Sequence, residues 1–188
     1  MRDFVTVVSG LPRSGTSLMM QMLAAGGLPL LVDGQRPPDA DNPRGYFEYA
    51  PVKRSAQDVG WWPDAVGRAV KVVHGLLRYL PEAGEARIVL LERDLGEVLR
   101  SQRRMLERTG VAVEADDDAT LERVFEAQLD EARAWTAARP RTALLRVAHA
   151  SLIRSPRDVA PRIQAFLGGG LDAEAMIACV DPGLYRCR

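Results

Sequence analysis

A short turn near the N-terminus combines glycines, an arginine and hydroxyl side chains in a pattern that can bind an anion. Residues 10–17 read GLPRSGTS, a G-x-x-x-x-G spacing between a β-branched run and a segment of helical periodicity. Where a strand turns through glycines into a helix, the unpaired N–H groups of the helix N-terminus bind phosphate-like groups. An ordinary strand–turn–helix connection is the alternative interpretation of the same spacing.

The turn departs from a Walker A loop in the position of its positive charge. A Walker A loop continues after its second glycine with Lys and then Ser or Thr. Here Thr16 and Ser17 follow Gly15, and the cation lies inside the loop at Arg13. Kinases use the lysine, together with Mg²⁺, on the transferred phosphoryl group. The sequence therefore indicates an anion other than a nucleoside triphosphate.

A second pair of residues with binding potential lies in the string IVLLERDLGEVLRSQ. Arg93 ends an apolar run, and Ser101 follows it by eight residues. If 86–93 is a strand of a parallel sheet, Arg93 lies at the carboxyl edge, where open α/β sheets bind ligands. Asp94 is expected to cap a helix over 94–110, and Ser101, about two turns farther on, returns to the same helical face. Taken singly, Arg93 also fits a surface strand end and Ser101 a solvent-facing helix position.

These residues need a scaffold of alternating strands and helices, and the rest of the chain predicts one. Apolar runs and helical periodicity place strands at 4–9, 69–74, 86–93 and 142–147, and helices at 17–27, 94–110, 118–138 and 156–170. Residues 28–64 contain six prolines and break both patterns. The alternation predicts the α/β class: a three-layer P-loop fold with a central, mostly parallel sheet flanked by helices, as a single domain over 1–188.

The string PRSGTSLM resembles the 5′-phosphosulfate loop of the PAPS-dependent sulfotransferases, most closely the tyrosylprotein and carbohydrate branches, which carry Arg where cytosolic members carry Lys. The family's 3′-phosphate site has an Arg that closes a strand and a Ser eight residues later, which is the spacing found here. The resemblance implies that 3′-phosphoadenosine-5′-phosphosulfate (PAPS) is held by Pro12, Arg13, Ser14, Gly15, Thr16, Ser17, Arg93 and Ser101. A sulfuryl group carries less charge than a phosphoryl group, so the catalytic guanidinium of Arg13 and helix N–H groups can stabilise the leaving oxygen without a metal.

The resemblance further implies in-line transfer of the sulfuryl group to a hydroxyl or amine of a small-molecule or carbohydrate-like acceptor. Two alternatives stay open. One is a P-loop nucleotide or small-molecule kinase, which the missing lysine and a strand ending in Glu-Arg, instead of a Mg²⁺-binding Asp, argue against. The other is a nucleotide-binding protein without catalysis.

The transfer needs a base to take the proton of the acceptor. His74 lies in AVKVVHGLLRYLP, which is similar to a family segment where a strand delivers Lys and His, although Lys71 precedes His74 by three residues instead of two. Glu48, in NPRGYFEYAPVK, is the rival, since the tyrosylprotein and heparan branches use a glutamate; Asp33 is the third candidate. Lys71 and Lys53 are the only lysines, and either can neutralise the sulfuryl group or serve as a surface charge.

Two further family segments are altered. LLRVAHASLIRSP is similar to the strand and turn near the adenine, but His149, Ala150 and Ser151 replace the usual residues there. The Gly-rich C-terminal 3′-phosphate segment is not recognisable, and Arg186 or Arg188 in LYRCR is the candidate to replace it.

Five of the eleven aromatic residues lie close together, namely Tyr46, Phe47, Tyr49, Trp61 and Trp62. Such rings either wall an acceptor or adenine site or pack the long loop onto the sheet. Packing is the favoured role for at least three of the five.

The amino-acid composition limits which partners and which compartment are expected. The 25 basic and 25 acidic residues balance, which argues against general attraction to nucleic acid or anionic membranes. The start, MRDFVTVVSG, has neither a leader pattern nor a membrane span. Cys179 and Cys187 lack metal-ligand spacing and read as free thiols of a reducing compartment. We therefore predict a cytoplasmic protein without a bound metal.

Overall fold

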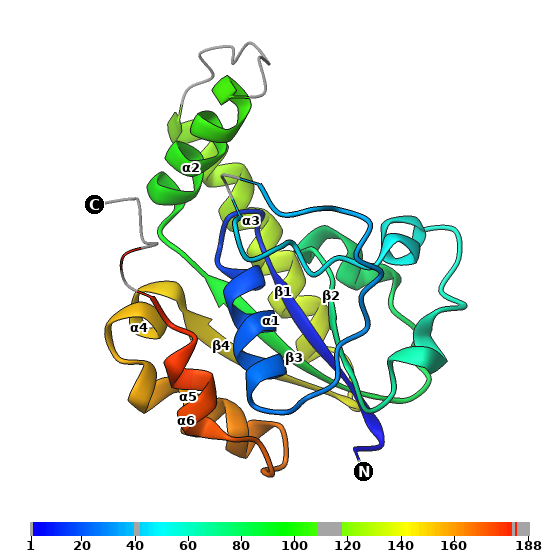
Figure 1. Ribbon diagram of the computed structural model, residues 1–188. Coiled ribbons are helices and arrows are strands. Elements are labelled where there is room, and N and C mark those ends of the chain that lie inside the picture. The colour runs from blue at the N-terminus through cyan, green and yellow to red at the C-terminus, as the bar shows by residue number, and fades with distance from the viewer. Residues whose placement is uncertain (1, 40–41, 109–117, 182, 184–188) are drawn as a thin grey trace.

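A sheet of four parallel strands, in the order β2-β1-β3-β4, forms the centre of the molecule in a computed structural model that describes residues 2–39, 42–108, 118–181 and 183 (Figure 1). The strands are β1 (Phe4–Gly10), β2 (Ala69–Lys71), β3 (Glu85–Glu92) and β4 (Thr142–Ala148). Every residue of β1 is buried, as expected for a strand paired on both edges and covered on both faces.

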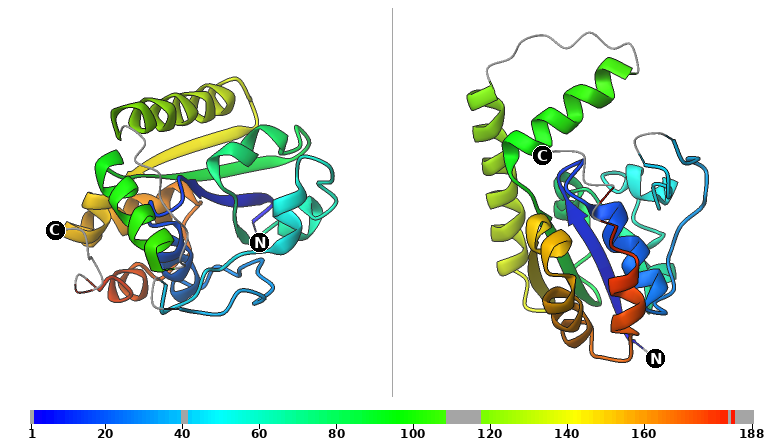
Figure 2. Two further views of the ribbon diagram at one scale, coloured as in Figure 1. Left: turned by 90° about the horizontal axis from the view of Figure 1, so that it is seen from above. Right: turned by 60° about the vertical axis from the view of Figure 1, so that its left-hand side comes forward.

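Helices cover both faces of the sheet, because successive strand side chains point to opposite sides. In β1, Phe4 and Val8 join one core cluster, whereas Val5 and Val7 join the other. The first cluster is completed by α1 (Thr16–Ala25), α5 (Pro156–Phe166) and α6 (Ala173–Ala178), and the second by α3 (Asp118–Ala137) and the 3₁₀ turn η3 (His74–Tyr79). Seen from above, α3 lies on one side of the sheet and α1 on the other (Figure 2). The predicted three-layer α/β fold is confirmed.

Helix α2 (Leu95–Arg108) begins at the carboxyl end of β3 and runs out past the edge of the sheet (Figures 1 and 2). The Glu97 N–H donates to Asp94 Oδ1 at 2.9 Å, which confirms the predicted cap. Val98 packs with Leu11 of the N-terminal turn and Leu129 of α3 in a small third cluster. These contacts hold α2 beside the turn that follows β1.

Some elements differ from the sequence prediction. The strand expected over 69–74 ends at Lys71, since the Leu76 N–H donates to the Val73 carbonyl and starts a 3₁₀ turn. The helix expected to reach residue 170 ends at Phe166. The six-residue helices α4 (His149–Arg154) and α6 were not predicted, and short helices leave little periodicity in a sequence.

The long connection between α1 and β2 contains two 3₁₀ turns, η1 (Ala50–Arg54) and η2 (Trp62–Ala65). Trp61 and Trp62 are buried against the sheet, with ring centroids 5.6 Å apart, and Phe47 packs on the opposite core cluster. The prediction that at least three of the five clustered aromatics serve packing is therefore confirmed. Within the described residues, no helix has the length and apolar character to span a membrane.

Candidate active site

At one position of the turn after β1, the backbone has a conformation that glycine adopts far more easily than other residues. Gly15 precedes α1 with φ +98°, in the left-handed region. A Cβ there would lie 2.6 Å from Cδ2 of His149, which is buried at the start of α4. The absence of a side chain at Gly15 therefore allows the backbone to pack closely against the buried His149 imidazole, directly before α1 starts.

The N–H groups of this turn divide into two sets. The Ser14 N–H donates to the Leu11 carbonyl at 3.1 Å, so this amide, which the sequence assigned to an anion, is engaged inside the loop. The first α-helical bond runs from the Met19 N–H to the Gly15 carbonyl at 3.1 Å. The amides of Thr16 and Ser17 precede that bond, so they lack an intrahelical acceptor and suit an anion.

The turn forms one wall of an open cleft of about 510 Å³ at the carboxyl edge of the sheet. Other walls come from α2, Arg36, the segment around residues 42–53, the end of β2 and His149. The cleft is strongly basic although the whole chain has no net charge: among its described lining residues, two carboxylates, Glu48 and Asp181, face eight cations. The cations are Arg13, Arg36, Arg44, Lys53, Lys71, Arg93, Arg104 and Arg108. Such a lining attracts a polyanion.

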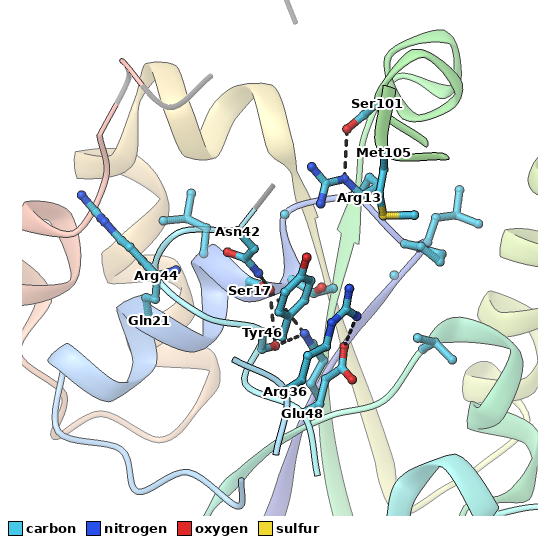
Figure 3. A pocket seen from close by; sticks show the side chains of 18 of the residues that line it. Arg13, Ser17, Gln21, Arg36, Asn42, Arg44, Tyr46, Glu48, Ser101 and Met105 are labelled. Carbon is cyan, nitrogen blue, oxygen red and sulfur yellow. Dashed lines mark hydrogen bonds and ion pairs between the residues drawn. The ribbon is translucent and has the colours of Figure 1, made fainter. Parts of the chain in front are cut away.

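The structure brings Arg13, Ser101 and Arg93 together at one end of the cleft. Nε of Arg13 donates to Ser101 Oγ at 3.0 Å (Figure 3). Nη1 of Arg93 donates to the Arg13 carbonyl at 2.9 Å, and its Nε pairs with Glu97 at 2.9 Å. The strand-end arginine and the helix serine therefore meet the anion-binding turn, as their spacing predicted.

Lys71 lies at the other end of the turn. Its ammonium donates to Ser17 Oγ at 3.3 Å and to the Tyr46 carbonyl. Asn42 Nδ2 donates to the same Ser17 Oγ at 2.8 Å (Figure 3). Burial lowers the pKa of Lys71 to about 8, with the charge of Glu48 opposing that shift. Lys71 is still mostly protonated at neutral pH, so it supplies a cation beside the first turn of α1.

Glu48 lines the cleft and is close to the positive charges of Arg36, Lys53 and Lys71. Its carboxylate pairs with Arg36 at 3.0 Å and with Lys53 at 2.9 Å. Burial of Glu48 acts to raise its pKa, but the hydrogen bond from Lys53 and the charges of Lys71 and Arg36 outweigh burial and hold the pKa below its usual range. Arg36 also stacks on the Tyr46 ring, 3.3 Å from its centroid. The Glu48 carboxylate is therefore ionised at neutral pH.

No protein-family model and no curated protein sequence matches this chain. Solved structures do match. The sulfotransferase domain of the Synechococcus PCC 7002 olefin synthase aligns with 98% of this chain and 87% of its own, at 19% identity and a TM-score of 0.58. The sulfotransferase domain of the curacin biosynthetic pathway aligns over 92% and 76%, at 15% identity and a TM-score of 0.53. Retinol dehydratase, solved with androsterone and the inactive cofactor PAP, aligns over 96% and 64%, at 16% identity and a TM-score of 0.51.

The chain has the sulfotransferase fold. The likeness rests on the α/β architecture, since the identities are low. Among the described residues, no three His, Cys, Asp or Glu side chains gather as they would around a metal ion.

Within this sulfotransferase fold, His74 and Asp33 are not brought to the cleft. His74 starts η3, where its Nδ1 lies 3.3 Å from the Gly10 carbonyl and its Nε2 lies 2.8 Å from Gln128 Oε1, facing α3. The Asp33 carboxylate accepts from the N–H groups of Ala50 and Gln35, and these bonds lower its pKa. Both side chains hold backbone segments in place. Because β2 ends at Lys71, the side chains of Lys71 and His74 point in different directions. Lys71 reaches Ser17 in the cleft, whereas His74 reaches Gln128 of α3.

In the sequence, His149 is distinguished only as a departure from the family's adenine segment. In the structure it lines the cleft, with 6% of its surface exposed. Burial lowers the pKa of His149 to about 4, and the charge of Arg93 adds to that effect. The imidazole is therefore neutral at physiological pH. Arg186 and Arg188, the C-terminal candidates, lie outside the described residues.

Proposed function

We propose that this chain is a PAPS-dependent sulfotransferase. The observation that carries the proposal is one basic cleft with two anion-binding ends: the first turn of α1 with Lys71 at one end, and Arg13, Ser101 and Arg93 at the other. A nucleotide with a phosphate group at each end of its ribose suits two such ends. The presence of PAP in retinol dehydratase, which has the same fold, supports the choice of nucleotide.

The residues present fit this donor. The amides of Thr16 and Ser17 and the Lys71 ammonium suit the 5′-phosphosulfate, because helix N-terminal N–H groups and a nearby cation both stabilise negative charge. Ser101 has 8% of its surface exposed and keeps its hydroxyl at the cleft wall, where the 3′-phosphate would bind.

We propose an in-line transfer of the sulfuryl group. The acceptor oxygen or nitrogen forms a bond to sulfur while the bond from sulfur to the 5′-phosphate oxygen breaks, and 3′,5′-ADP leaves. Lys71 and the first-turn amides stabilise the charge that develops on the leaving oxygen. The acceptor proton passes to a carboxylate or imidazole near the attacking atom.

We assign the base to Glu48. Its carboxylate lines the cleft, is ionised, and lies next to an apolar wall formed by Tyr49, Val52, Val72 and Leu76. That wall suits the body of a small acceptor, with its nucleophile directed toward Glu48. His74 faces α3 instead. The acceptor itself is a hydroxyl- or amine-bearing small molecule in this proposal.

Calorimetry with three nucleotides tests the donor site. 3′,5′-ADP should bind at least about tenfold more tightly than 5′-AMP, since a charge-assisted hydrogen bond contributes about 1.5–3 kcal/mol. ATP with Mg²⁺ should bind no better than 5′-AMP. Tighter binding and hydrolysis of Mg²⁺–ATP would instead support a kinase, and equal binding of 3′,5′-ADP and 5′-AMP would contradict the assignment.

Turnover of PAPS with a panel of phenols, alcohols and amines tests the base. Glu48→Gln should lower transfer at saturating PAPS by about 10²–10⁴-fold, because it removes the proton acceptor. The 3′,5′-ADP affinity of the same variant, measured separately, reports the loss of the ion pairs with Arg36 and Lys53. His74→Gln serves as the matched control and should retain most of the activity. The reverse ranking would reassign the base, and binding of 3′,5′-ADP without transfer by the unmodified protein would indicate a nucleotide-binding protein without catalysis.

A further inference from the structure

Two cations flank the glutamate that we assign as the base, and both remain accessible from solvent. Nη1 of Arg36 lies 3.0 Å from Glu48 Oε1, and Nζ of Lys53 lies 2.9 Å from Glu48 Oε2. The side chains of Arg36 and Lys53 are 43% and 65% exposed, against 20% for Glu48. A guanidinium and an ammonium each carry several N–H donors, more than one carboxylate uses. Both cations can therefore bind a second anion that enters the cleft.

The loop that delivers Arg36 and Glu48 is closed at its neck by Asp33. The Asp33 carboxylate accepts from the Ala50 N–H, and the Asp33 N–H donates to the Glu48 carbonyl at 3.2 Å. Within this loop the Arg36 guanidinium lies over the Tyr46 ring, 3.3 Å from its centroid, and reaches Glu48 (Figure 3). These contacts hold Arg36 beside the base before an acceptor binds, which lowers the cost of ordering it.

The charge around the base is positive on the side that faces solvent. Arg36, Lys53 and Lys71 all act on the Glu48 carboxylate, and Asp33 is the second acid near Lys53. Three positive charges thus stand against two negative ones, and both oxygens of Asp33 already accept backbone N–H bonds. Lys71 is half-buried and contacts Ser17, whereas Arg36 and Lys53 are exposed. The excess of positive charge is therefore open to an anionic acceptor.

The apolar wall of the cleft lies next to these cations. Val52 belongs to that wall, and Lys53 follows it directly in η1. Such a wall suits a hydrocarbon or aromatic body. Each cation lies about 3 Å from the base, so an anion in contact with either cation would be within about 6 Å of the Glu48 carboxylate. An acceptor of this shape has its acid group only a few bonds from the hydroxyl that reacts.

We propose that the acceptor is an amphiphilic hydroxy acid: its carboxylate binds Arg36 and Lys53, its hydroxyl meets Glu48, and its apolar body lies on the wall. This inference rests on the proposed function and names the acceptor class of the same site. Arg36 and Lys53 are then specificity-determining residues, because both give charge-assisted hydrogen bonds to the acid group of the acceptor.

Paired kinetics with 3-hydroxybenzoate and 3-hydroxybenzamide test the acceptor class. The two probes have nearly the same shape, and only the first is an anion at neutral pH. The readout is the ratio of their kcat/KM values at saturating PAPS. The unmodified protein should prefer the acid by about tenfold or more, and Lys53→Met and Arg36→Met should each reduce this preference by about tenfold. Arg54 is the neighbour of Lys53 in η1, is exposed and is not among the described residues that line the cleft, so Arg54→Met is the matched control and should keep the preference.

The ratio separates recognition of the acceptor from support of the base. Lys53→Met and Arg36→Met each remove an ion pair with Glu48, and this loss changes transfer to both probes by the same factor. If Lys53→Met slows both probes equally, Lys53 only holds Glu48 and the inference is wrong. It is also wrong if the unmodified protein uses the amide as well as the acid, or accepts only neutral compounds.

These outcomes leave the sulfotransferase proposal standing. That proposal fails separately, if the unmodified protein does not distinguish 3′,5′-ADP from 5′-AMP. Transfer to no compound at all would contradict both the proposed function and the acceptor class. Lys53 is largely exposed, so Lys53→Met carries the test alone should Arg36→Met not fold.

Discussion

Replacing Gly15 by alanine should destabilise the protein through two separate effects at the anion-binding turn. The residue has φ +98°, and an L-residue in the left-handed region costs about 1–2 kcal/mol. The added Cβ would also lie 2.6 Å from Cδ2 of His149, which is only 6% exposed and has little room to move. Overpacking of this kind costs about 1–3 kcal/mol. The free energy of unfolding should therefore fall by roughly 2–5 kcal/mol.

A second glycine provides the matched control. Gly27 has φ +90°, but a Cβ there would meet no atom within 4 Å. Gly27→Ala should therefore show only the backbone cost, about 1–2 kcal/mol. Urea unfolding of both variants, followed by circular dichroism, gives the two values. Their difference isolates the contact between residue 15 and His149.

A double-mutant cycle completes the measurement. His149→Ala removes the ring that the new methyl group meets, so Gly15→Ala should cost about 1–3 kcal/mol less in that background. If Gly15→Ala costs no more than Gly27→Ala, or if His149→Ala brings no relief, then the turn does not press against His149 and the described geometry of the loop is wrong.

Two predictions concern pH. One follows from the lowered pKa of Lys71, and the other from the lowered pKa of His149. Burial lowers the pKa of Lys71 to about 8, so its positive charge is lost as pH rises through that value, and the affinity for 3′,5′-ADP should fall between about pH 7 and 9. Lys71→Met should flatten this dependence in calorimetry, and an equally steep decline in Lys71→Met would assign it to another group. His149 has its pKa lowered from 6.5 to about 4, so the unfolded chain binds a proton more readily than the folded one. The stability that His149 contributes is complete above pH 6.5 and is lost as pH falls through about 4, a loss of roughly 3 kcal/mol at ~1.4 kcal/mol per pH unit. Urea unfolding at pH 7, 5.5 and 4 should show a smaller decline for His149→Gln than for the unmodified protein; equal declines would refute this.

Local patterns in the sequence were sufficient to predict the framework of the site. The β-branched run before Gly10 and the glycine turn predicted strand, loop and helix, and Asp94 predicted the start of α2. Arg93 and Ser101 were expected near the loop because strand ends of a parallel sheet meet at one edge. Their contacts with Arg13 agree with that reasoning.

The remainder depended on contacts between distant segments. Val72 and Val73 continue the β-branched pattern of β2, so nothing local indicates that the strand ends at Lys71 and that His74 turns toward Gln128. The role of His149 depends on its packing against Gly15, more than a hundred residues earlier in the chain. The basic cleft was equally hidden, because a balanced total charge does not reveal how charges are distributed over a folded surface.

The most direct measurement is a crystal structure of the complex with 3′,5′-ADP. We expect the 5′-phosphate on the amides of Thr16 and Ser17 near Lys71, and the 3′-phosphate within about 3 Å of the Ser101 hydroxyl. A nucleotide bound in the reverse direction, or outside the cleft between α1 and α2, would contradict the central claim that the two ends of this cleft each hold one phosphate of the same nucleotide.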